Sequence, residues 1–129
     1  MNKILVEVSV GELLDKISIL EIKQEKIKDP EKLKFINDEH IILKNQLDNN
    51  VKSDEKLNTL FQSLKDINAK LWVIEDDKRM CEKSSGFTEN FIKVSRDVHF
   101  LNDGRAKIKL EMNNHTGSKI KEIKEYTSY

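Results

Sequence analysis

The stretch LWVIEDDKRMCE, at residues 71–82, concentrates side chains that could bind a ligand or a metal ion. It contains the only tryptophan of the chain, a run of three acids and an arginine, which are Trp72, Glu75, Asp76, Asp77 and Arg79. Carboxylate oxygens are ligands that Mg²⁺ prefers, and a guanidinium group can hold a phosphate through two parallel hydrogen bonds. These residues are therefore the first candidates for a functional site.

A second polar segment, RDVHFLNDGR, occupies residues 96–105 and carries Asn102 and Asp103 between two arginines. All the arginines of the chain, Arg79, Arg96 and Arg105, lie in these two segments, although Lys and Arg together number 23. A guanidinium offers a planar, two-pronged donor that an ammonium lacks. In a lysine-rich chain, an arginine therefore suggests a position that lysine cannot fill.

The two segments are expected to lie side by side, because a helical hairpin that turns near Gly86 would bring them together. Helical spacing also places Lys78 and Arg105 on the apolar stripes of their helices, where a cation needs a partner. We therefore predict one polar cluster. Its members are Trp72, Glu75, Asp76, Asp77, Arg79, Arg96, Asn102, Asp103 and Arg105.

This cluster has two interpretations. In the first it is a network of salt bridges that neutralise one another, with Trp72 as a core or interface anchor and with no metal or cofactor. In the second it is a polar pocket for an anion or a metal ion. The second interpretation assigns Mg²⁺ to Glu75, Asp76 and Asp103, and phosphate to Arg79 and Arg105.

Paired acids elsewhere suggest a different metal site. Glu12 and Asp15 are three residues apart, as are Glu122 and Glu125, and four carboxylates on paired helices can bind Mg²⁺ and hydrolyse nucleotides. However, Glu12 is expected to act in a helix cap, and Lys78 lies where Glu75 would need an acidic partner. Nucleotide hydrolysis is therefore the weaker alternative.

The histidines and the cysteine give little support for catalysis. His40 lies on an apolar stripe, where a hydrogen-bonded core or interface residue is expected, and Cys81 has no evident His or Asp partner in sequence. A single cysteine cannot form an internal disulfide, which favours a reducing compartment and a cytoplasmic protein.

Apolar spacing predicts four long helices. The first runs over about 10–28 behind an extended arm or short strand at 3–8, and the second runs over about 30–48, with Asp29 as its cap and Pro30 in its first turn. The third spans about 30 residues, with Ser53 as a possible cap, and breaks at KSSGFT. The fourth begins near Thr88 and ends at NNHTGS. A short last helix after Ser118 is also predicted.

The chain is predicted to be one all-α domain over residues 1–129, an elongated antiparallel, coiled-coil-like bundle built on a long helical hairpin. It has 129 residues, no formal net charge and 36% charged side chains, which makes a nucleic-acid partner unexpected. No apolar run suggests a membrane span. Apolar residues make up only 37%, and long thin helices leave stripes uncovered, so a homodimer is expected.

Several segments resemble a small bacterial and phage family catalogued as a domain of unknown function. They are VEVSVGELLDKISILEIK, LWVIEDDKR, RDVHFLNDGRAKIK and GSKIKEIKEY, which match the family in order and spacing over nearly the whole chain. The resemblance implies that these segments belong to one shared design. It brings no activity, substrate or catalytic residue.

These observations favour a non-catalytic accessory or interaction protein with a charged cleft, which could accept an anionic small molecule. The alternative is a Mg²⁺-dependent enzyme, or a binding protein, acting on a nucleotide or a phosphorylated sugar.

Overall fold

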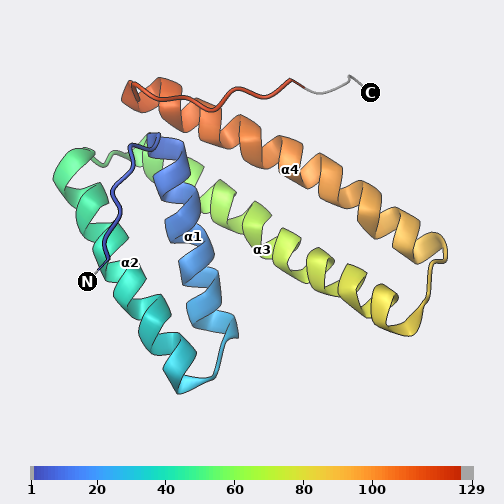
Figure 1. Ribbon diagram of the computed structural model, residues 1–129. Coiled ribbons are helices and arrows are strands. Elements are labelled where there is room, and N and C mark those ends of the chain that lie inside the picture. The colour runs from blue at the N-terminus through green and yellow to red at the C-terminus, as the bar shows by residue number, and fades with distance from the viewer. Residues whose placement is uncertain (1, 126–129) are drawn as a thin grey trace.

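The protein folds into four helices joined by short turns, as a computed structural model of residues 2–125 shows (Figure 1). The helices are α1 (Val10–Lys26), α2 (Pro30–Asn50), α3 (Glu55–Ser84) and α4 (Glu89–Thr116). No strand occurs among residues 2–125, and the residues before α1 form an extended arm. The prediction of an all-α helical bundle is confirmed.

The first two helices begin where their capping residues predict. The Ser9 hydroxyl accepts a hydrogen bond from the Glu12 backbone N–H at 3.0 Å and thereby satisfies one free donor of the first turn. Asp29 does the same for Glu31 at 3.2 Å, and Pro30 occupies the first helical turn, where its missing N–H is not needed. The sequence therefore encodes the α1–α2 hairpin locally.

The cap of α3 differs from the prediction by one residue. Asp54, not Ser53, accepts the hydrogen bond from the Leu57 backbone N–H at 2.8 Å. The Ser53 hydroxyl instead donates to the Asn58 side chain at 3.0 Å. A carboxylate is favoured at this position because its charge also complements the positive end of the helix dipole.

The predicted last helix after Ser118 is wrong within the described residues. Gly117 ends α4 with a positive φ of 69°, as expected, but residues 118–125 are not helical. The Ser118 hydroxyl donates to the Ile120 carbonyl and accepts from the Val10 backbone N–H, so it holds the start of α1 rather than capping a helix. Tyr126, which was also expected to belong to this last helix, lies outside the described residues.

The apolar core lies where α1 crosses the α3–α4 hairpin. Leu14, Leu57, Leu64 and Met112 form one buried cluster from three helices. Burying a leucine or methionine side chain stabilises a fold by roughly 1.5–3 kcal/mol. Helix α1 packs against all three other helices, whereas the backbone of α2 lies close to α1 alone (Figure 1).

Beyond this core the α3–α4 hairpin extends away from α1 and α2 (Figure 1). We call residues 72–103 of the hairpin the distal arm. Between Leu71 and Lys109 only Val94 is buried. Each helix of the arm therefore buries little more than the stripe of side chains that faces the other helix. Among the described residues, no helix is both long enough and apolar enough to cross a membrane.

Candidate functional site

A pocket of about 340 Å³ lies where α1 meets the α3–α4 hairpin. Ile19 and Ile22 of α1 and Leu71 of α3 supply its apolar wall. Its polar lining comes from α3 and α4 and consists of Asn68, Trp72, Glu75, Asp76, Arg79 and Arg105. Helical spacing explains the α3 side, because residues three and four apart share one face of a helix.

The structure brings many of the predicted cluster residues together at this pocket. Those that line it are Trp72, Glu75, Asp76, Arg79 and Arg105. Those that do not line it are Asp77, Arg96, Asn102 and Asp103. The Trp72 segment and Arg105 thus meet at one pocket on neighbouring helices, whereas the outer members of the cluster are spread over the distal arm.

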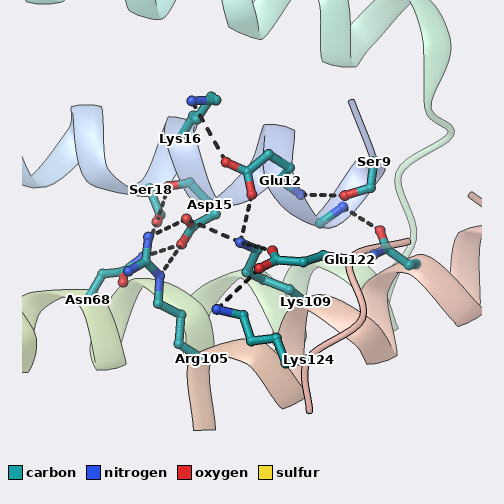
Figure 2. Close-up of polar contacts among 12 residues, drawn as sticks. Ser9, Glu12, Asp15, Lys16, Ser18, Asn68, Arg105, Lys109, Glu122 and Lys124 are labelled. Carbon is teal, nitrogen blue, oxygen red and sulfur yellow. Dashed lines mark hydrogen bonds and ion pairs between the residues drawn. The ribbon is translucent and has the colours of Figure 1, made fainter. Parts of the chain in front are cut away.

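Arg105 finds its partner on α1, not on α3. Its Nε donates to Asp15 Oδ1 at 2.9 Å and its Nη2 donates to Asp15 Oδ2, which gives a two-pronged pair. Asp15 is almost fully buried, at 1% exposure. Figure 2 shows the Asp15 carboxylate pointing toward Arg105. The prediction that Arg105 is neutralised by the acids of the Trp72 segment is wrong, because α1 places a buried carboxylate closer.

Asn68 and Ser18 complete the surroundings of this pair. The Asn68 amide donates to Asp15 Oδ1 at 2.9 Å and to the Ser18 hydroxyl at 2.8 Å (Figure 2). Burial is the largest influence on the Asp15 carboxyl and would raise its pKa. The hydrogen bonds from Arg105 and Asn68, together with the positive charges of Arg105 and Lys109, outweigh burial, so the pKa of Asp15 is lowered.

Lys109 joins Asp15 to two further acids. Its ammonium lies 2.7 Å from Glu12, 3.2 Å from Glu122 and 3.7 Å from Asp15 (Figure 2). Burial would lower the pKa of Lys109, but the surrounding carboxylates raise it above its usual value. Glu12 was expected to act in a helix cap, and its spacing from Asp15 resembled that of a metal site. Both carboxylates instead bind Lys109.

The start of α1 is fixed to the end of α4 by its backbone. The Gly11 N–H donates to the Asn113 side chain at 2.7 Å. A Cβ at Gly11 would lie only 2.6 Å from the Lys109 carbonyl oxygen, so only glycine permits this close approach. Asp15, one turn further along α1, is thereby held over Arg105 and Lys109.

A family model described as a family of unknown function, DUF6165, matches residues 4–129. The chain belongs to family DUF6165. No curated protein and no solved structure matched the chain in further comparisons. In this DUF6165 chain the segments GELLDK, NDGRAKIK and GSKIKE supply most of the network around Asp15 and Lys109.

The acids and the arginine on the α3 side of the DUF6165 pocket are not joined to one another. In the part of the chain that the structure describes, Arg79 forms no ion pair with Glu75 or Asp76. The salt-bridge interpretation therefore fits the network behind the pocket better than the pocket itself. The α3 charges stay available to a ligand.

Within residues 2–125, no group of three or more His, Cys, Asp or Glu side chains is arranged to hold a metal ion. Of the acids predicted to bind Mg²⁺, Glu75 and Asp76 line the pocket and Asp103 does not. His40, as expected, is satisfied by a neighbour, because its Nε2 lies 3.1 Å from Glu21.

Sequence reasoning missed the partnership between Asp15 and Arg105. The signal was present, because Gly11, Asp15, Ser18 and Ile22 follow one another at helical spacing and all are buried. An acid on the buried face of one helix and a cation on the buried face of another require each other. Matching them would have identified the pair.

Proposed function

We propose that the protein is a non-catalytic binding protein whose pocket between α1, α3 and α4 takes an anionic small molecule. The observation that carries the proposal is that Arg79 and Arg105 line one pocket beside the only tryptophan, Trp72. Arginine can bind a phosphate through two parallel hydrogen bonds, and an aromatic side chain in the same pocket can pack against a ring attached to that phosphate.

Arg105 is suited to this role because Asp15 fixes its position. The pair uses Nε and Nη2, which leaves the Nη1 edge of the guanidinium outside the bonds to Asp15. The side chain of Arg105 is 29% exposed, so it lies at the wall of the pocket rather than beneath it. A donor that is already oriented loses little conformational entropy when it binds a ligand.

The network behind Arg105 also carries an excess of positive charge. Its cations outnumber its acids by one; they are Lys16, Arg105, Lys109 and Lys124, against Glu12, Asp15 and Glu122. Arg79 adds a further charge on the opposite wall. An anionic group between the two arginines is therefore favoured electrostatically.

Glu75 and Asp76 restrict the rest of the ligand. These exposed carboxylates would repel a second anionic group and would accept hydrogen bonds from hydroxyl or amino groups. The ligand that suits this lining has one anionic end, a flat or ring-shaped body against Trp72, and several donors. A nucleotide or a phosphorylated sugar has this chemistry, and a pocket of about 340 Å³ has room for a small one.

A thermal-shift and calorimetry panel of inorganic phosphate, sugar phosphates and nucleoside monophosphates tests this function. A ligand present at about 100 times its Kd should stabilise the protein by about 2.7 kcal/mol. Arg79→Gln should weaken binding at least tenfold. Arg96→Gln removes the same charge outside the pocket and should leave binding unchanged. Equal binding by both variants, or binding of none of these compounds at millimolar concentration, would contradict the proposal.

Phosphorus NMR of the same mixtures with added Mg²⁺ checks the non-catalytic part. We expect the bound ligand to stay intact over many hours. Steady turnover that Arg79→Gln abolishes would favour the enzyme alternative instead.

A further inference from the structure

The distal arm combines many exposed apolar side chains with little buried surface. Five of its large apolar residues are about half exposed: Val73 at 49%, Met80 at 56%, Phe87 at 53%, Ile92 at 57% and Phe100 at 50%. Val94 is the only buried residue of the arm. Two helices that bury so little depend on additional packing, which in four-helix bundles comes from a second pair of helices.

Charge is distributed unevenly along the arm. The half nearest the core, residues 72–77 and 97–103, contains five acids and no lysine or arginine. The acids are Glu75, Asp76, Asp77, Asp97 and Asp103. We call this the acidic half. The tip, residues 78–96, contains five cations and two acids. The cations are Lys78, Arg79, Lys83, Lys93 and Arg96, and we call this the basic half.

The boundary between the halves falls at the same level on both helices. On α3 the sign changes between Asp77 and Lys78, and on α4 it changes between Arg96 and Asp97. These positions lie at matching distances from the turn that joins the helices, so the arm is one acidic segment followed by one basic segment. The exposed pair Lys93–Asp97, at 2.9 Å, joins one charge of each half.

We propose that a second copy of this chain packs along the distal arm in antiparallel orientation, with the acidic half of each copy against the basic half of the other. A two-fold axis through the boundary makes both contacts equivalent, as in a closed dimer. The exposed apolar residues of both arms then lie within a four-helix bundle. A parallel arrangement would set acids against acids and is disfavoured by repulsion.

Light scattering measures the first consequence. The wild-type chain should have twice its mass of 15.1 kDa at micromolar concentration. Lys83→Glu with Arg96→Glu leaves the basic half with four acids against three cations, and this variant should dissociate to one chain. Lys32→Glu with Lys34→Glu makes the same change of charge on exposed positions of α2 and should leave the dimer intact.

Mixing two variants tests whether the charges of the arm select the partner. The triple variant D77K/D97K/D103K has three lysines against two acids in its acidic half, so both halves of its arm are positive. It should be monomeric alone, and it should form a heterodimer with K83E/R96E, whose arm is negative throughout. Circular dichroism confirms that each variant is folded. A monomeric wild type overturns the proposal, and so does dimerisation of each variant by itself.

Discussion

Asp15 illustrates how a buried charge is retained only with fixed partners. Its carboxylate is contacted by Arg105, Asn68 and Lys109, which come from two other helices. Each partner favours the charged form, and together they offset the cost of burial. The same pair orients Arg105 at the pocket wall, so one interaction serves both stability and the proposed binding.

Asp15→Asn should destabilise the fold by about 3–5 kcal/mol, because it leaves Arg105 without its buried counterion. It should also make stability less dependent on pH. The folded pKa of Asp15 lies below its ordinary value of 3.8, so its contribution is complete above that pH and is lost as the pH falls through the folded pKa. The free energy of unfolding, measured in urea, should therefore fall more steeply between about pH 5 and pH 2 for the wild type than for Asp15→Asn.

Two other carboxyls with lowered pKa values, Asp54 and Glu122, weaken the fold in the same pH range. The difference between wild type and Asp15→Asn isolates the contribution of Asp15. Asp97→Asn removes an exposed partner of Lys93 and should cost less than about 0.5 kcal/mol. Parallel pH profiles for the wild type and Asp15→Asn would show that Asp15 is not linked to folding as described.

At the scale of elements, the contact between α1 and α4 sets the position of the pocket. Gly11 lets the backbones of the two helices approach closely, and Asn113 and Ser118 bind the free N–H groups at the start of α1. The pocket wall formed by Ile19 and Ile22 then stands at a fixed distance from α3. A small shift of α1 would move Ile19 and Ile22 and would therefore change the shape of the pocket.

Gly11→Ala should destabilise the protein by about 1–3 kcal/mol, because its Cβ would meet a backbone carbonyl oxygen. Gly104→Ala is the matched control. Its Cβ would meet only the end of the flexible Ile67 side chain, at 3.3 Å, and alanine favours the helix by up to about 1 kcal/mol. Chemical denaturation of both variants should separate them clearly. A neutral Gly11→Ala would contradict the close approach of α1 to α4.

At the scale of the whole molecule, stability is unevenly distributed. The buried cluster of Leu14, Leu57, Leu64 and Met112 lies at one end of the hairpin, and the distal arm extends from it with a single buried residue, Val94. Local opening costs less where fewer apolar contacts must be broken. In the isolated chain the arm is therefore the first part expected to open.

Hydrogen exchange in the K83E/R96E variant measures this gradient. Amides of the arm should exchange at least tenfold faster than amides of α3 near Leu64, which is fully buried. In a wild-type dimer the arm amides should regain protection, because packing with the second copy buries them. Uniform protection along α3 in the monomeric variant would rule out an independently opening arm.

Most of the helices could be predicted from local signals. Apolar residues recur every three or four positions, Asp29 and Pro30 mark the start of α2, and Gly117 marks the end of α4. The prediction of a last helix after Ser118 was wrong. The Ser118 hydroxyl accepts a hydrogen bond from the start of α1, and the local sequence does not indicate this contact. Part of the site was also predictable, since Trp72 and Arg79 follow from helical spacing on α3.

The sequence by itself determined the four amphipathic helices, the hairpin that joins α3 to α4, and the division of charge along its arm, because these depend on neighbours within a few turns. Only the tertiary structure decided that Arg105 pairs with Asp15 and that Lys109 gathers Glu12 and Glu122. The way in which α1 crosses the hairpin determines these partners. The crossing depends on a backbone approach at Gly11, and such an approach has no periodic pattern in the sequence.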